Sequence, residues 1–132
     1  MMSKKVRWLL SISGLIIFLS WSFRLYVLFT RWGTDRFSFV DLFIVLTSFS
    51  IGVFLLWMAK QGAKASARDY MILIATSLFN LAWWGNRWIQ VTLHPENDPN
   101  PRAHLHLASL YLVMGFLLLL AGWTGRKRLA RK

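Results

Sequence analysis

Four apolar runs in this chain are each long enough to cross the hydrocarbon core of a membrane, and they restrict the possible folds more than any other feature. A helix needs about 20 residues to span that distance. The runs extend from about residue 8 to 30, 39 to 58, 70 to 90 and 103 to 123. Hydrophobic residues make up 56% of the chain, more than a soluble domain of this size can bury. The sequence therefore predicts an all-α integral membrane protein, with one domain over residues 1–132.

Helix-start patterns precede three of the runs. Ser38 and Ser66 each stand three residues before an aspartate, Asp41 and Asp69, close to the capping-box pattern. Before the fourth run, an asparagine can cap the helix and Pro101 can take its first position, where the missing N–H costs nothing. Because the connecting loops are short, we expect a four-helix bundle with up-down-up-down topology.

Basic residues gather in three segments that fall on one side of a protein with four spans. The amino-terminal tail, the second loop and the carboxy-terminal tail hold three, three and five of the 16 Lys and Arg residues. These residues are Lys4, Lys5, Arg7, Lys60, Lys64, Arg68, Arg126, Lys127, Arg128, Arg131 and Lys132. On the other side, five arginines, Arg36 among them, are offset by four carboxylates. The positive-inside rule therefore predicts that both termini are cytoplasmic, in the inner (plasma) membrane of a bacterial cell, and that the third loop faces outward.

The formal net charge of +11 is spread over the ends of apolar runs, where it would meet membrane lipid, and this distribution argues against nucleic acid as a partner. The chain has no cysteine, which excludes disulfides, thiolate metal ligands and cysteine nucleophiles. It also has no glycine-rich phosphate loop and no nucleophile elbow. A non-catalytic role is therefore expected, and the sequence leaves any cofactor unknown.

All three histidines lie in the stretch LHPENDPNPRAHLH, residues 93–106. One hypothesis is a metal or haem site built from His94, Glu96, Asp98, His104 and His106, a nitrogen and oxygen set that suits zinc, copper or manganese. On a helix, His104 and His106 are about 200° apart, so only one of them can join His94 and the carboxylates. The alternative is a solvated polar loop stiffened by its three prolines.

Polar residues at the outward ends of the runs form a second candidate, the polar outer cluster of Arg24, Asp41, Asn86 and Arg87. Ionisable residues in membrane segments are rare and often functional. Asp41 at a helix start and the two arginines near helix ends also have a purely structural explanation, in which they complement helix dipoles or pair with one another.

A third candidate is the aromatic stretch WWGNRW, whose Trp83, Trp84 and Trp88 are predicted to contact lipid, a pigment or a neighbouring subunit. An aromatic belt at the membrane interface explains the same residues. No stretch of the chain matches a family motif residue by residue.

Three functions follow from these candidates. The leading hypothesis is a small accessory or assembly subunit of a larger membrane complex, in contact with other integral membrane subunits through its helices and outer loop. The alternatives are a metal- or haem-binding protein with the outward-facing histidine site, and a small transporter or lipid-handling protein with a pocket formed by Arg24, Asp41 and Arg87.

Overall fold

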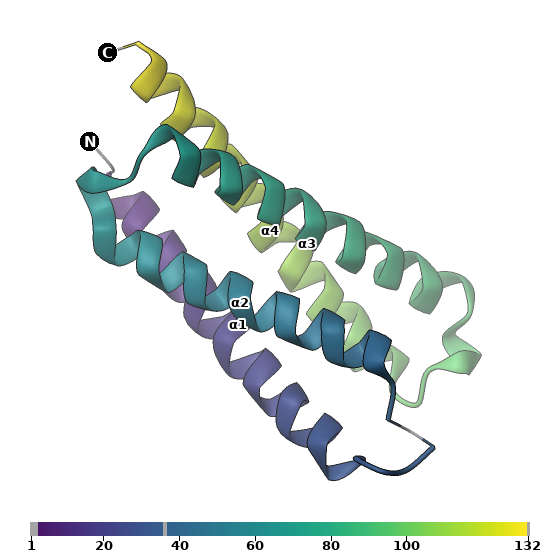
Figure 1. Cartoon of the computed structure of the whole chain (residues 1–132). Helices are drawn as coiled ribbons and strands as arrows, with labels where there is room; N and C mark the ends of the chain where they lie inside the picture. The colour runs from purple at the N-terminus through teal and green to yellow at the C-terminus, as the bar shows by residue number, and fades with distance from the viewer. Residues whose placement is uncertain (1–2, 36, 132) are drawn as a thin grey trace. The chain divides into compact units, whose positions relative to one another are not determined.

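The computed structural model describes residues 3–35 and 37–131, and every regular element in these ranges is a helix. The α-helices are α1 (Lys4–Thr30), α2 (Phe39–Gln61), α3 (Ala67–Leu93) and α4 (Pro101–Ala130) (Figure 1). Two short 3-10 helices, η1 (Gly62–Lys64) and η2 (Pro95–Asn97), follow α2 and α3. The all-α prediction is confirmed, and each predicted run lies within one of the α-helices. Two residues counted in the orientation prediction, Arg36 and Lys132, lie outside the described ranges.

Three of these helices are long and apolar enough to cross a membrane: α1, α2 together with η1, and α4. α3 has the same length as α1, 27 residues, but is less apolar. The reason lies in its second half, which carries Asn80, Asn86, Arg87 and Gln90. Among the described helices, α3 is therefore the one whose crossing of a membrane depends on how its polar groups are satisfied.

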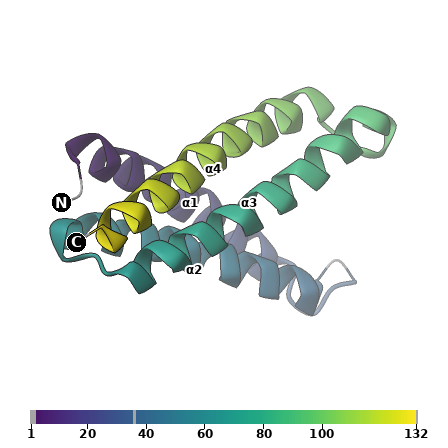
Figure 2. The ribbon, with the colours of Figure 1, turned by 90° about the horizontal axis from the view of Figure 1, so that it is seen from above.

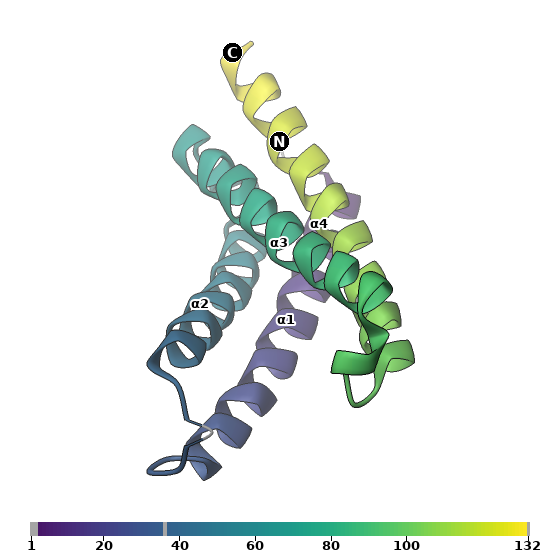
Figure 3. The ribbon, with the colours of Figure 1, turned by 90° about the vertical axis from the view of Figure 1, so that its right-hand side faces the viewer.

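The helices form two compact units, residues 1–65 and 66–132, and each unit is an antiparallel hairpin. In the first hairpin, α1 and α2 lie side by side (Figures 1 and 3). Their backbones approach closely at two glycines. A Cβ on Gly52 would stand 2.8 Å from the backbone nitrogen of Phe18, and one on Gly14 would stand 3.1 Å from the carbonyl oxygen of Gly52. Buried Ser13 and Ser48 extend this contact of small residues, which is typical of helix pairs in membranes.

In the second hairpin, α3 and α4 run in opposite directions and are joined by the turn that contains η2 (Figure 2). Asn80 is buried and donates from Nδ2 to the carbonyl oxygen of Tyr111 at 3.0 Å, so a hydrogen bond links the two helices. Trp84 stacks on the Tyr111 ring with centroids 4.5 Å apart. Gly115 lies against Asn80, where a Cβ would be 2.8 Å from Nδ2. A glycine thus makes room for the polar link.

The helix starts follow the capping residues predicted from the sequence. Ser66 and Asp69 form a reciprocal capping box at the start of α3. At the start of α2, the Ser38 hydroxyl accepts from the backbone N–H of Asp41 at 3.5 Å. α4 begins with Pro101 at its first position, after an asparagine whose side chain accepts a backbone N–H. Local hydrogen bonding thus fixes where these three helices begin.

Candidate functional site: the α3–α4 corner

Asp98 is the centre of a polar cluster where α3 turns into α4. Its Oδ1 accepts from the backbone N–H of Asn100 at 2.9 Å, and Nδ1 of His104 lies 2.6 Å from the same oxygen. Its Oδ2 accepts from Nη2 of Arg87 at 3.1 Å. The side chain of Asp98 is only 4% exposed. We call Arg87, Asp98, Asn100 and His104 the corner cluster.

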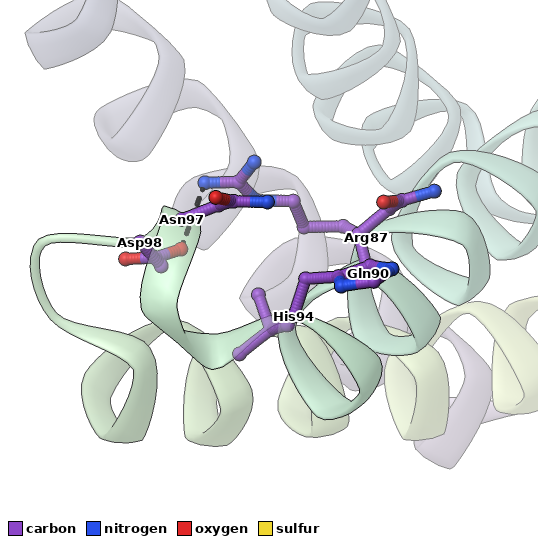
Figure 4. Close-up of a pocket in the computed structure, with 6 residues that line it drawn as sticks. Arg87, Gln90, His94, Asn97 and Asp98 are labelled. Atoms are coloured by element: carbon purple, nitrogen blue, oxygen red, sulfur yellow. Dashed lines mark hydrogen bonds and ion pairs between the residues drawn. The ribbon is translucent and has the colours of Figure 1, made fainter.

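The local sequence explains why these groups meet. Arg87 lies in the second-to-last turn of α3, and η2 turns the chain back toward it. Asp-Pro-Asn then forms a tight turn in which the Asp98 side chain bonds the backbone two residues later. His104 follows in the first turn of α4. The side chains of Arg87 and Asp98 meet across the corner in Figure 4.

The surroundings of Asp98 keep it ionised. Burial alone would raise the pKa of Asp98. The N–H of Asn100, the ring of His104 and the charge of Arg87 act in the opposite direction, and the pKa of this carboxyl lies below its usual value. An ionised carboxylate can only accept hydrogen bonds, so Nδ1 of His104 is the donor in their contact. In the neutral ring, Nε2 is then left as an acceptor.

His94 and Glu96 form a separate pair. Nδ1 of His94 lies 3.3 Å from Oε1 of Glu96, and both side chains are largely exposed. The backbone N–H of Glu96 and the ring of His94 lower the pKa of the Glu96 carboxyl. The five residues of the metal hypothesis are thus divided: Asp98 meets His104, Glu96 meets His94, and His106 is exposed with no hydrogen bond to the described residues.

This division matches the geometric argument that His104 and His106 point to different sides of one helix. Within residues 3–35 and 37–131, no three side chains of the His, Asp and Glu types are grouped as a metal ion would need. The metal or haem site stays a prediction, and its strongest element is His104, whose ring is oriented by a carboxylate as in many metal sites.

The corner also holds a shallow pocket of about 150 Å³. Arg87, Gln90, Val91, His94, Asn97 and Asp98 line it, and Figure 4 shows their side chains around it. Sequence reasoning did not include Asn97 or Val91 and did not pair Arg87 with Asp98. The Asp-Pro-Asn turn was the signal for this pairing, because it aims the carboxylate of Asp98 back at the end of the preceding helix.

The polar outer cluster divides between the two hairpins. Arg24 on α1 and Asp41 in the first turn of α2 are both exposed, and no ion pair joins them within the described part of the first hairpin. Asn86 is exposed on α3, and the ion pair of Arg87 is the one with Asp98. A pocket formed by Arg24, Asp41 and Arg87 stays a prediction.

The three tryptophans of the WWGNRW stretch differ in their surroundings. Trp84 is buried, 8% exposed, against Tyr111 of α4, so it belongs to the core of the hairpin. Trp83 is half-buried and Trp88 is exposed. Helical geometry explains the difference, since Trp84 falls on the same side of α3 as Asn80 and Ser77, one and two turns earlier.

Comparison with known protein families, with curated proteins and with solved structures finds no match.

Proposed function

We propose that this chain is a small non-catalytic subunit of a larger membrane protein complex, held in the inner membrane by four spanning helices with both termini in the cytoplasm. The observation that carries the proposal is the large apolar surface that the hairpins leave uncovered. In the most apolar window of α1, α2–η1 and α4, only 28%, 22% and 39% of the residues are buried. Lipid and partner helices are the surroundings that suit such a surface.

The polar groups of α3 support its inclusion as a fourth span. A backbone or side-chain polar group in the hydrocarbon core needs an internal partner. Asn80 finds one in the carbonyl of Tyr111, and the hydroxyl of Ser77 donates to the carbonyl of Leu73 at 2.7 Å. Arg87, near the end of the helix, is held by Asp98 from the loop. The other two amide side chains of α3, Asn86 and Gln90, are exposed in its last two turns, where headgroups would lie.

The corner cluster supports a structural role for the third loop. Both carboxylate oxygens of Asp98 are bonded, to Arg87, His104 and a backbone N–H, so its charge stabilises the turn. On α4 the next hydroxyl, that of Ser109, donates to the carbonyl of Leu105 within its own helix. The arrangement thus holds α3 against α4 and presents His94, Glu96 and Asn97 outward, as a contact surface for another subunit would require.

The charge distribution supports the orientation. In the first hairpin, the carboxylates Asp35 and Asp41 lie at the loop end, and the lysines lie at the opposite end. In the second hairpin, Glu96 and Asp98 lie at the corner, and four of the six arginines lie at the opposite end, near the start of α3 or the end of α4. This asymmetry favours cytoplasmic termini.

Co-purification from native membranes in a mild detergent tests the accessory role. We expect larger integral membrane proteins to be recovered with the chain, identified by mass spectrometry. Trp88→Ala, which truncates an exposed side chain of the WWGNRW stretch, the predicted contact region next to the third loop, should reduce this recovery. Trp8→Ala, which truncates an exposed tryptophan near the start of α1 and far in sequence from the third loop and the WWGNRW stretch, is the control. Recovery of the wild-type chain only as a free monomer at native expression would contradict the proposal.

A further inference from the structure

The first hairpin has one end where α1 begins and α2 ends. An arginine is held in a fixed position at this end. Nε of Arg7 on α1 donates to the carbonyl oxygen of Ala59 in the last turn of α2 at 3.1 Å. This carbonyl lacks an intrahelical partner at the helix end, and a cation there also complements the helix dipole. Arg7 is thus anchored through one of its five N–H groups.

Gly62 is the second residue of this end that lies against Arg7. It ends α2 with φ of +55°, and its backbone N–H bonds the carbonyl of Met58. A Cβ on Gly62 would stand 3.4 Å from both Cζ and Nε of Arg7, so the guanidinium lies directly against a residue without a side chain. Within the described residues, no carboxylate or carbonyl bonds the Nη groups of Arg7, which form the outer fork of the guanidinium.

Three lysines lie close in sequence to these contacts. Lys4 lies one turn before Arg7 on α1, Lys60 directly follows Ala59 in the last turn of α2, and Lys64 ends η1. All three lysines are exposed. The carboxylates of the described part of this hairpin, Asp35 and Asp41, belong to its opposite end. Arg7 and the three lysines thus lie at the same end of the first hairpin, and the described part of this hairpin has no carboxylate there.

Two tryptophans indicate where this end of the first hairpin would lie in a membrane. Trp8 follows Arg7 directly and is 62% exposed, and Trp57 lies one turn before Lys60 and is 44% exposed. Indole rings prefer the boundary between headgroups and hydrocarbon. In a membrane, the arginine fork and the lysines would therefore lie at the depth of lipid phosphates, beside rings that can contact the upper part of an acyl chain.

We propose that Arg7, with Lys4, Lys60 and Lys64, forms a binding site for the phosphate group of an anionic phospholipid. The planar fork matches two phosphate oxygens, and the contacts with Ala59 and Gly62 hold it in place before the lipid arrives. The lysines add attraction as point charges. The site rests on the proposed insertion of the first hairpin in a membrane and does not depend on the accessory role.

Lipid titration of the purified full-length chain tests the site. The chain in a mild detergent is titrated with phosphatidylglycerol, phosphatidylcholine or inorganic phosphate, and bound lipid is counted by native mass spectrometry. We expect phosphatidylglycerol to bind more tightly than phosphatidylcholine, and Arg7→Gln to weaken its binding by about fivefold, the effect of one basic residue near a headgroup. Arg7→Lys, which keeps the charge and removes the fork, should also weaken binding.

Lys5→Gln is the matched control. It removes the same charge two residues away, about 200° around the same helix from Arg7, and should leave binding unchanged. An equal loss in Lys5→Gln and Arg7→Gln would overturn the proposal in favour of diffuse attraction. Displacement of phosphatidylglycerol by an equal concentration of inorganic phosphate would overturn the lipid assignment and leave a site for free phosphate.

Because Arg7 also caps α2, its removal could unfold this end of the first hairpin, which circular dichroism of each variant would reveal. The double variant Lys60→Gln/Lys64→Gln keeps the bond to Ala59 and should still weaken phosphatidylglycerol binding, and full binding in this variant would overturn the proposal. Selective lipid binding without co-purified subunits would support the lipid site and contradict the accessory role. Co-purified subunits without selective lipid binding would support the accessory role and contradict the lipid site.

Discussion

At the scale of single residues, the corner cluster shows which part of the site could be predicted from the sequence. The concentration of His94, Glu96, Asp98 and His104 in one loop was visible in the sequence. Their division into two pairs was not, because it depends on the turn at Asp98 and on the position of Arg87 across the corner. Residue types indicate which groups can interact, and the backbone path decides which of them do.

The stability of the corner should depend on acid through Asp98. Its pKa is lowered in the folded chain, so ionised Asp98 stabilises the corner at pH values above its unfolded pKa of about 3.9. This stabilisation is lost as the pH falls through the folded pKa. We therefore expect constant protection of the backbone amides at the start of α4 above about pH 5 and a loss below about pH 4, measured by hydrogen exchange.

In Asp98→Asn, protection should be weaker at neutral pH and should lose this acid dependence, because the side chain no longer titrates. Glu96→Gln is the control, since Glu96 is exposed and its side chain pairs with His94 only. A wild-type transition near neutral pH that persists in Asp98→Asn would show that another group governs the corner.

Asn80 should contribute measurably to the pairing of α3 with α4. Asn80→Leu keeps the size of the side chain and removes its bond to the Tyr111 carbonyl. We expect a loss of about 1 kcal/mol in the free energy of unfolding, within the range of hydrogen bonds between membrane helices. Thr76→Val, which removes a hydroxyl bonded only within α3, should cost less in the same denaturation in mixed micelles. Equal losses would mean that the bond between the helices adds nothing.

At the scale of the helices, the starts and the apolar runs could be predicted from local sequence, while the contact between helices could not. Ser38, Ser66 and Pro101 act within one turn of their own helix, so their effect is readable along the chain. The approach of α1 and α2 at Gly14 and Gly52 joins residues 38 positions apart in the sequence. Small residues permit such a contact, but they do not reveal which helix will make it.

Gly52 should tolerate no larger residue. In Gly52→Ala the new methyl group would stand 2.8 Å from the backbone nitrogen of Phe18, and a backbone cannot rotate aside as a side chain can. We expect α1 and α2 to move apart, at a cost of about 1–3 kcal/mol. In Gly85→Ala the nearest neighbour is the flexible end of Leu112 at 3.8 Å, so stability should be unchanged or slightly raised. Thermal unfolding in detergent compares the two variants with the wild-type chain. Equal stability of Gly52→Ala and Gly85→Ala would contradict the close packing of α1 and α2.

At the scale of the whole molecule, composition and hydropathy predicted an all-helical membrane protein. They distinguished α3 less well, because its polar residues lower the apolar signal that the other three helices carry. Whether such a helix crosses the bilayer depends on partners for those residues. Tyr111 of α4 supplies one for Asn80, and Asp98 of the loop supplies one for Arg87. Hydropathy alone does not include this compensation.

The crossing of α3 can be tested because the chain has no cysteine. Single cysteines at exposed positions, Ala63→Cys before α3 and Asn97→Cys after it, are offered to a membrane-impermeant maleimide in intact cells. We expect labelling of residue 97 and protection of residue 63 until the membrane is opened. Asp35→Cys, in the loop between α1 and α2, is the control and should label like residue 97. Equal behaviour of residues 63 and 97 would mean that α3 does not cross.

The division into two hairpins has a consequence for how the protein is made. Every residue of the contact between α1 and α2 has been synthesised once position 65 is added, so this pair can close while the ribosome is still translating α3. The second pair gains its polar links only when α4 follows. The order of translation would therefore let the α1–α2 hairpin insert first. The less apolar α3 would insert together with α4, which bonds the side-chain amide of Asn80.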